Sequence, residues 1–252
     1  MSFTGSADAY DRFMGRYSVR LAPSFADFAG IGPGQSVLDV GSGPGALTTE
    51  LVQRLGSTAV AAVDPSEQFV TAARERHPGV DVQRAAAEGL PFDDDQFDAA
   101  LAQLVVHFMG DPARGLGEMA RVTLPGGVVA ACVWDHAGGK SPLAPFWDAV
   151  HELDADAMDE SAMAGGREGH LAELLTDLGL RDVEQTALPV SVEHAAFDEW
   201  WEPFTLGVGP AGTYATSLDP ESREELRERC KARLGPGPFA IDSRAWTARG
   251  HV

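Results

Sequence analysis

The fold of this chain is decided by the stretch Val37-Leu38-Asp39-Val40-Gly41-Ser42-Gly43-Pro44-Gly45-Ala46-Leu47-Thr48. A short apolar run leads into three glycines within five positions, and residues that favour a helix follow. This order predicts a strand, a tight turn and a helix. Because glycine has no Cβ and tolerates positive φ, a ligand can lie directly against the main chain of such a turn.

Two classes of nucleoside cofactor fit this turn. Gly41, Gly43 and Ala46 satisfy the dinucleotide pattern G-x-G-x-x-G/A, in which a pyrophosphate lies at the N-terminus of the helix. Asp39 favours the other class, because its carboxylate would repel a pyrophosphate but could bind the ammonium group of an amino-acid-bearing cofactor, directly or through water. A strand–turn–helix corner without a ligand is the third interpretation.

Composition excludes several partners. The chain has 252 residues, 44% of them hydrophobic, which is enough for one large domain or for a domain with an inserted cap. Its formal charge is −19, without a basic cluster, so nucleic acid and anionic membrane surfaces are not expected partners. No apolar stretch approaches the roughly 20 residues that cross a bilayer, and residues 1–10 lack a signal core. Cys132 and Cys230 form no C-x-x-C pair, which favours a reducing cytoplasm.

Between residue 36 and about residue 135, short apolar runs alternate with amphipathic stretches, which predicts β-α-β units on a parallel sheet. The predicted strands are 36–40, 59–64, 80–85, 97–104 and 128–134. The predicted helices are 46–55, 66–76 and 113–122, and Pro125-Gly126-Gly127 is expected to turn the last helix into its strand. The carboxyl ends of these strands would share one edge, where open α/β sheets bind ligands.

The flanking regions follow a looser pattern. Residues 1–35 are expected to form an N-terminal helical segment, with one or two helices in 10–28 that could close over a cofactor. Beyond residue 135 the sequence predicts helices at 145–153, 168–178 and 221–234, and strands at 183–192 and 239–247. No internal repeat occurs.

Asp64 ends the second predicted strand, 19 residues after Gly45. A carboxylate at a strand end can accept hydrogen bonds from both hydroxyls of a ribose. The alternative is that Asp64 caps the following helix. Ser66 is the better candidate for that cap, which leaves Asp64 for the ribose.

With Asp39 in front of its three glycines, the turn resembles motif I of the class I methyltransferases that use S-adenosylmethionine. The stretch Ala85-Ala86-Ala87-Glu88-Gly89-Leu90-Pro91-Phe92 is similar to a loop of the ubiquinone and menaquinone biosynthesis methyltransferases, which commonly reads Gly-Asp-Ala-Glu before Leu-Pro-Phe. An Asp of that loop contacts the adenine amine in the family, and this chain has Ala86 at its position. The main-chain amide of Ala87 could still bond a ring nitrogen, and Glu88 could substitute or face water.

The resemblance implies an α/β fold: a seven-stranded, mostly parallel sheet with helices on both faces, Rossmann-like, and a helical cap. The methyltransferase domain would span residues 36–252, with cap segments at about 136–166 and 195–237. The implied cofactor is S-adenosylmethionine, with S-adenosylhomocysteine as its product. Together the motifs and the resemblance give these candidate cofactor-binding residues: Tyr10, Tyr17, Asp39, Gly41, Ser42, Gly43, Gly45, Asp64, Pro65, Ser66, Ala87, Glu88 and Gln103.

His107 follows the fourth predicted strand, where donor and acceptor would meet. Its pKa range suits a base that takes a proton from the acceptor, but a packed or surface histidine without chemistry is the alternative. The other histidines lack ligand spacing, and the run at 93–95 is typical of a solvated turn, so no metal site is expected. Methyl transfer from a sulfonium can proceed largely by aligning the reactants, so a catalytic triad is not required.

The sequence therefore predicts a cytoplasmic, S-adenosylmethionine-dependent methyltransferase, monomeric or homodimeric, that acts on oxygen, nitrogen or carbon of a small and partly apolar molecule. Two alternatives remain open. One is an NAD-dependent oxidoreductase, which has to accommodate Asp39 near a pyrophosphate. The other is a non-catalytic protein of the same fold that binds the cofactor or a partner, which the missing Asp at Ala86 keeps open.

Overall fold

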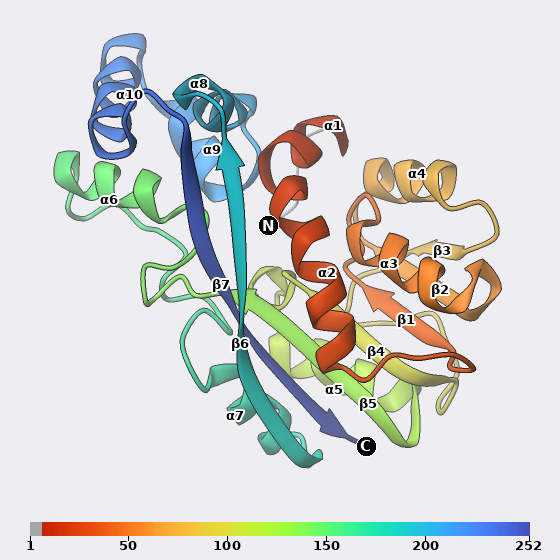
Figure 1. Cartoon of the computed structure of the whole chain (residues 1–252). Helices are drawn as coiled ribbons and strands as arrows, with labels where there is room; N and C mark the ends of the chain where they lie inside the picture. Colours follow the sequence, from red (N-terminus) through yellow and green to blue (C-terminus); the bar gives the residue numbers. More distant parts are fainter. Residues whose placement is uncertain (1–6) are drawn as a thin grey trace.

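The computed structural model describes residues 7–252, so the first six residues of the expected N-terminal segment lie outside the described part. The sheet has seven strands in the order β3-β2-β1-β4-β5-β7-β6 (Figure 1). Neighbouring strands are parallel from β3 to β5, and β7 runs antiparallel to β5 and β6. The strands are β1 Val37–Val40, β2 Val60–Asp64, β3 Asp81–Arg84, β4 Phe97–Gln103, β5 Thr123–Trp134, β6 Arg181–His194 and β7 Phe239–His251. The prediction of a seven-stranded, mostly parallel α/β sheet is confirmed.

Helices cover both faces of this sheet. The α-helices are α1 Ala7–Tyr10, α2 Arg16–Phe28, α3 Ala46–Leu55, α4 Glu67–Arg76, α5 Pro112–Val122, α6 Ala144–Leu153, α7 His170–Asp177, α8 Phe197–Trp201, α9 Gly209–Ser217 and α10 Pro220–Leu234. Shorter helical turns are η1 Asp11–Gly15, η2 Ser57–Ala59, η3 Val106–Phe108 and η4 Glu202–Leu206. Among these helices none is long and apolar enough to cross a membrane.

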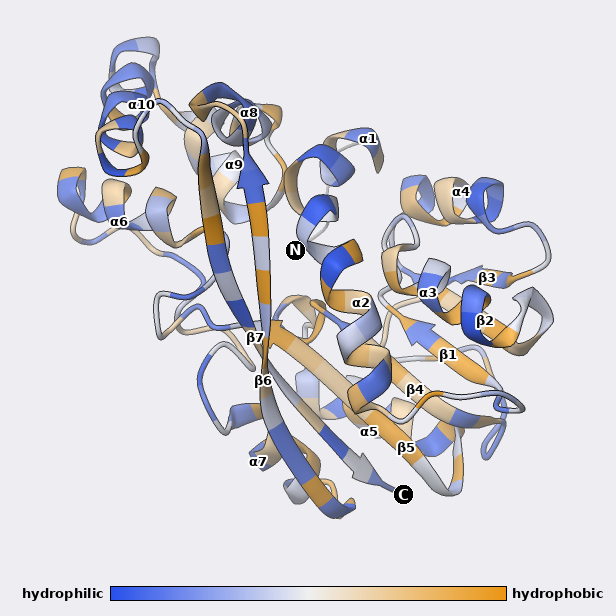
Figure 2. Ribbon diagram, viewed as in Figure 1, coloured by the Kyte–Doolittle hydropathy of each residue, from blue (hydrophilic) through white to orange (hydrophobic). Residues whose placement is uncertain are grey.

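The core consists of two layers because successive strand residues face opposite sides of the sheet. In β4, Ala99 and Leu101 pack with α2 and α3, whereas Ala100 and Ala102 pack with α5 and α7. All four side chains are fully buried. A strand that is buried on both faces reads as a continuous apolar run, and β5 is accordingly largely hydrophobic in Figure 2, whereas α10 is largely hydrophilic.

Two parts of the fold differ from the sequence expectation. β5 begins at Thr123, ahead of the expected turn at residues 125–127, because Thr123 already pairs with Phe97 and an irregular register before Ala99 accommodates the Pro-Gly-Gly segment. The segments α8, η4 and α9 were not predicted. They are short and interrupted by Gly and Pro, and aromatic packing holds them, with the Phe146 and Phe204 rings stacked at 4.5 Å between centroids.

The helices α6, α8, α9 and α10 gather at the end of the long β6–β7 hairpin, beyond the carboxyl ends of the parallel strands (Figure 1). Trp200, Trp201 and Phe204 are buried there among one another, so they pack these helices together and do not line the cavity described below.

Candidate functional site

The glycine turn joins β1 to α3. Gly41 has φ +71°, and a Cβ at this position would lie 2.4 Å from Cγ2 of Val105, so the packing of Val105 against the turn requires glycine. Gly43 has φ +54°, and a Cβ there would meet nothing within 4 Å, while its main chain lines a cavity. The turn therefore exposes main chain at Gly43 to whatever enters the cavity.

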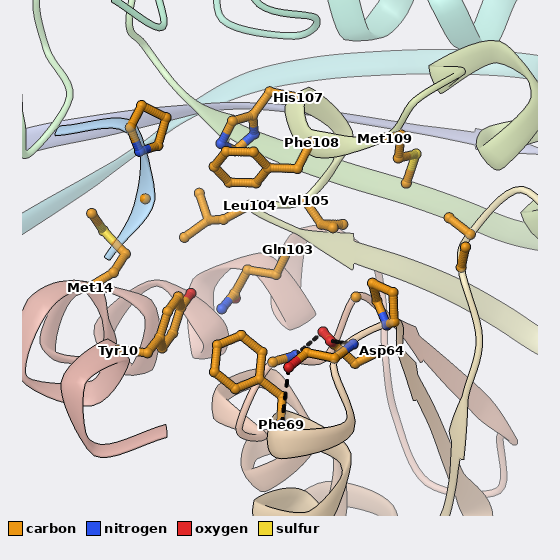
Figure 3. A pocket seen from close by; sticks show the side chains of 18 of the residues that line it. Tyr10, Met14, Asp64, Phe69, Gln103, Leu104, Val105, His107, Phe108 and Met109 are labelled. Carbon is orange, nitrogen blue, oxygen red and sulfur yellow. Dashed lines mark hydrogen bonds between the residues drawn. The ribbon is translucent and has the colours of Figure 1, made fainter. Parts of the chain in front are cut away.

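Asp64 stands at the end of β2 beside this turn. Its Oδ2 accepts a hydrogen bond from the Gly43 N–H at 2.9 Å, and its Oδ1 accepts one from the Ser66 N–H at 2.8 Å (Figure 3). Ser66 itself caps α4 by accepting from the Phe69 N–H at 3.5 Å. Burial raises the pKa of Asp64, and the two backbone hydrogen bonds act against this shift. Asp64 thus lies fixed at the cavity wall, and Ser66 performs the capping.

Asp39 lies behind the turn and not on the cavity wall. It is 1% exposed, and the Thr48 hydroxyl donates to its Oδ2 at 2.6 Å. Its Oδ1 has no hydrogen-bond partner among the described residues. Burial raises the pKa of Asp39 to about 7. A direct contact of this carboxylate with a ligand in the cavity is therefore not part of the geometry.

A cavity of about 520 Å³ lies at the carboxyl ends of β1, β2, β4 and β5, under η1 (Figure 3). This volume falls within the range of small-molecule and cofactor sites. The predicted site residues that line it are Tyr10, Gly41, Gly43, Asp64, Pro65, Ser66, Ala87, Glu88, Gln103 and His107. The predicted residues that do not line it are Tyr17, Asp39, Ser42 and Gly45.

The two tyrosines expected over the cofactor occupy different places. Tyr10 lines the cavity, with its ring edge-on to Phe69 at 5.4 Å between centroids. Burial raises the pKa of Tyr10 to about 12. Tyr17, one helical segment later, is buried away from the cavity, and its hydroxyl lies 3.0 Å from Nε2 of His194. Tyr17 therefore connects α2 to the end of β6.

The loop after β3 contributes Ala86, Ala87 and Glu88 to the cavity wall. Oε1 of Glu88 accepts hydrogen bonds from the Gly110 N–H at 2.7 Å and from the Asp111 N–H at 3.2 Å. Glu88 thus fixes this loop to the segment that starts α5. Its carboxylate has a structural role here, and the wall next to it consists of alanine side chains and main chain.

At the end of β4 the chain bends sharply. Leu104 has φ +61°, a strained conformation for a residue with a Cβ, and its N–H donates to the Cys132 carbonyl at 2.8 Å. This bend directs η3 across the cavity and brings His107 to its wall (Figure 3). Gln103, just before the bend, donates from Nε2 to the Ser18 carbonyl at 3.2 Å, and its buried Oε1 has no partner among the described residues.

The end of the cavity beyond Gln103 carries titratable groups that the sequence analysis missed. His136 follows β5, and Glu160 belongs to the segment between α6 and α7. Burial lowers the pKa of His107 well below its usual value, lowers that of His136 to about 4 and raises that of Glu160 to about 7. The signal for His136 was its position directly after the fifth strand, at the same edge as His107. No local pattern marks Glu160.

Neither metal nor thiol chemistry is indicated by the geometry. Within residues 7–252 no three His, Cys, Asp or Glu side chains gather as a metal site would require. Cys132 and Cys230 are free and buried, and burial raises the pKa of both thiols. Buried, protonated thiols are unreactive, so the polar groups of the cavity remain as the candidates for chemistry.

Five parallel strands, an antiparallel final hairpin, a glycine turn after β1 and an acid at the end of β2 together define the class I methyltransferase fold. Residues 38–131 match the family model described as a methyltransferase domain. Over these residues, somewhat more than a third of the chain, the protein is similar to the methyltransferases of this family.

Relatives of known sequence include proteins that are named as methyltransferases. An uncharacterized methyltransferase of Mycobacterium tuberculosis is 38% identical over 135 residues, which are 54% of this chain and 52% of that protein. A demethylmenaquinone methyltransferase of Renibacterium salmoninarum is 29% identical over 192 residues, 69% of this chain and 78% of that protein. The chain thus matches only about half the length of the first of these relatives.

Solved structures share the fold at low sequence identity. A SAM-dependent methyltransferase from Thermotoga maritima superposes with a TM-score of 0.57 at 19% identity and covers 97% of this chain and 95% of its own. The [4+2]-cyclase SpnF superposes with a TM-score of 0.57 at 21% identity, over 93% of this chain and 81% of its own. Such likeness shows the architecture, while the reaction has to be argued from the site.

Proposed function

We propose that this protein binds S-adenosylmethionine in the cavity at the carboxyl ends of β1, β2 and β4 and transfers its methyl group to a small, partly apolar molecule. The observation that carries the proposal is the pairing of Gly43 and Asp64. The exposed main chain of Gly43 allows close approach of a ligand, and the carboxylate of Asp64 is held beside it by backbone hydrogen bonds. This pairing is what a nucleoside with a free ribose requires.

The residues present fit the cofactor. Asp64 would accept hydrogen bonds from the ribose hydroxyls, because each carboxylate oxygen has a second lone pair beyond the one its backbone partner uses. Ala86 and Ala87 would hold the adenine end by main chain and apolar packing, since Glu88 is engaged with Gly110. The unpartnered Oε1 of Gln103 is a suitable acceptor for the ammonium group.

S-adenosylmethionine supplies a methyl group on a positively charged sulfur, ready for in-line displacement. The protein has to hold the acceptor in line with that group and to keep water out. Apolar side chains of Phe13, Met14 and Leu143 line the cavity and serve the second purpose. Arg84 at the rim contacts the Pro65 carbonyl at 3.1 Å, away from the bend after β4.

Calorimetric titration with S-adenosylmethionine and with S-adenosylhomocysteine tests the proposal. We expect both to bind well below millimolar concentration. If neither binds the wild-type protein at millimolar concentration, the proposal is wrong. NADH titration, followed by its fluorescence, tests the oxidoreductase alternative in the same preparation.

Methyl transfer needs its own test because one structural neighbour is named as a cyclase. Incubation with cofactor labelled in the methyl group, over a panel of phenols, amines and enols, is expected to give a labelled product. Cofactor binding without a product across the panel would favour the non-catalytic alternative.

The buried free thiols Cys132 and Cys230 also support our inference that the protein works in a reducing cytoplasm.

A further inference from the structure

Buried polar atoms without partners gather at the end of the cavity beyond Gln103, which we call the acceptor end and define by His107, His136 and Glu160. Glu160 is only 2% exposed. Among the described residues no hydrogen bond reaches Oε2 of Glu160, Nδ1 of His107 or Nε2 of His136. Because a buried polar group without a partner costs stability, such a cluster at a cavity wall marks a place where a ligand supplies the partners.

These side chains come from distant segments that the fold ties together. The rings of His107, on η3, and His136, after β5, lie 5.5 Å apart between centroids. A Cβ built at Gly166 would lie 3.5 Å both from Cβ of His136 and from the carbonyl oxygen of Glu160, so the two segments are direct neighbours. The Ala137 N–H donates to the Gly166 carbonyl at 3.0 Å and holds this arrangement.

The surroundings of the acceptor end select the charge of its ligand. Trp134, Leu143 and Pro210 supply apolar wall. Of the described residues that line the cavity, Arg84 alone is a lysine or arginine, and it lies at the opposite end, near Glu67. A carboxylate or phosphate ligand would find no counter-charge, and burying one unpaired is costly. The site fits a neutral, largely apolar ligand with a polar group.

The charge balance of methyl transfer distinguishes a histidine base from a carboxylate base. If a histidine takes the acceptor's proton, the positive charge of the sulfonium is replaced by a buried imidazolium. If Glu160 takes it as a carboxylate, a positive and a negative charge both disappear from a cavity of low polarity. The second outcome is favoured because burial penalises every charge that remains.

Protonation states agree with this assignment. Burial keeps the pKa of His107 and His136 low, so both rings are neutral near pH 7 and serve as hydrogen-bond partners. Burial raises the pKa of Glu160 to about 7, so its carboxylate is available as a base near neutral pH. The titratable and charged groups around Glu160 come from five elements: Asp159 in its own segment, His107 on η3, His136 and Asp135 after β5, His151 on α6 and Arg244 on β7. His151 lies 3.8 Å from Asp159, and Arg244 pairs with Asp135 at 2.7 Å.

We propose that Glu160 is the catalytic residue that accepts the proton when a hydroxyl group of a neutral, largely apolar acceptor is methylated. The proposal rests on the methyl transfer proposed above. The acceptor oxygen forms the new bond to the methyl carbon, its O–H bond breaks, and the proton moves to Oε2 of Glu160. The electron pair of the broken carbon–sulfur bond stays on sulfur, so atoms and charges balance. His107 and His136 position the acceptor through hydrogen bonds.

The first test measures binding of 2-naphthol, a planar neutral phenol, to protein saturated with S-adenosylhomocysteine. We expect the wild type to bind 2-naphthol at least about tenfold more tightly than naphthalene or 2-naphthoate, the scale of one hydrogen bond to a charged group. In Glu160→Gln this preference for the hydroxyl should fall severalfold. Tighter binding of 2-naphthoate, or no binding of 2-naphthol, would overturn the assigned acceptor class.

The second test follows the proton. The difference infrared spectrum between the wild type and Glu160→Gln should show the carbonyl stretch of a protonated carboxylic acid below neutral pH and lose it above. Single-turnover transfer of a labelled methyl group to 2-naphthol should slow by about 10²–10⁴-fold in Glu160→Gln, the usual contribution of a general base, and Glu160→Asp should restore part of it. No transfer by the wild type, or an unchanged rate in Glu160→Gln, would refute the role of Glu160.

The control is Glu168→Gln, which removes the same charge from an exposed position in the same segment and should leave both readouts unchanged. Binding of S-adenosylhomocysteine is measured in parallel for every variant. If it fails in the wild type, the proposed function is wrong. If it persists while Glu160→Gln behaves as the wild type, only the present inference is wrong.

Discussion

Two buried carboxyl groups stand at opposite ends of the same cavity and are treated differently by the fold. Asp64 accepts one backbone hydrogen bond on each oxygen, at 2.9 and 2.8 Å. Glu160 is buried more deeply, at 2% against 6% exposed, and its Oε2 accepts none among the described residues. The first group is fixed in position by backbone donors, whereas one oxygen of the second has no partner among the described residues.

This difference follows from the segments that carry the two residues. Asp64 ends a parallel strand, where the neighbouring turn and the following helix both present free N–H groups. Glu160 lies in a segment without helix or strand, between α6 and α7, where no hydrogen bond from the described residues reaches its Oε2 and the Trp147 indole is a nearby donor. Hydrogen bonds to the ionised form hold a carboxylate charged, while burial without them favours the proton. This difference supports the two proposed roles, cofactor binding for Asp64 and proton transfer for Glu160.

The largest effect is expected from Asp64→Ala. It should raise the Kd of S-adenosylhomocysteine by roughly 100-fold or more, about 3 kcal/mol, because two charge-assisted hydrogen bonds to the ribose are lost. Isothermal titration calorimetry measures this change. Glu160→Gln is the matched comparison and should shift the Kd by less than about threefold. Equal losses in both variants would remove the functional distinction between the two ends.

The second prediction concerns stability and its dependence on pH. Because the pKa of Glu160 is raised from 4.5 to about 7 in the folded state, the unfolded chain loses this proton first as the pH rises. The folded state is thus destabilised progressively between these two values. Glu160→Gln cannot ionise at this position. The difference in free energy of unfolding between Glu160→Gln and the wild type should therefore be about 2–3 kcal/mol larger at pH 8 than at pH 4.5, in favour of the variant.

Urea unfolding at several pH values measures this difference. Glu168→Gln is exposed and should run parallel to the wild type over the whole range. A wild type that stays as stable as Glu160→Gln at pH 8 would show that Glu160 finds a partner or water in the folded protein.

Asp39 is a third buried carboxyl group and lies between the two extremes, with one partner on one oxygen. Thr48→Val should lower the free energy of unfolding by about 1–2 kcal/mol, because it removes the hydrogen bond from the Thr48 hydroxyl to Oδ2 of this group. Urea unfolding checks it. Thr71→Val, at an exposed position on α4, is the control and should stay within about 0.5 kcal/mol of the wild type. A smaller loss in Thr48→Val than in this control would contradict the assignment.

The sequence predicted those parts of the fold and site whose signal lies within a short stretch of residues. The turn at Gly41–Gly45 and the acid Asp64 each belong to one strand end, and the periodicity of residues 36–135 positions them without knowledge of the rest. The helix Ala46–Leu55 was predicted to the residue. The helices α8 and α9 were not predicted, because they depend on aromatic packing, partly with segments far apart in the sequence.

The same limit applies to the site. His107 was placed at the cavity wall because it follows a strand, and His136 could have been found by the same argument. Glu160 reaches the cavity only through the path of an irregular segment, which no periodicity encodes. Tyr17 was expected over the cofactor together with Tyr10, and residues seven apart would share one face of a continuous α-helix. The π-helical turn Asp11–Gly15 between them breaks this spacing, and the Tyr17 hydroxyl lies against His194 at the end of β6.

The smallest effect is expected from Tyr17→Phe, which tests that placement. It removes the hydroxyl that lies 3.0 Å from Nε2 of His194 and should lower the free energy of unfolding by about 1 kcal/mol or less. The Kd of S-adenosylhomocysteine should stay within about twofold of the wild type, since Tyr17 contacts neither end of the cavity. A tenfold rise of the Kd with unchanged stability would mean that α2 moves on binding and brings Tyr17 to the ligand. The contrast between a binding end and a proton-transfer end would then have to include the N-terminal helix as a third, mobile wall.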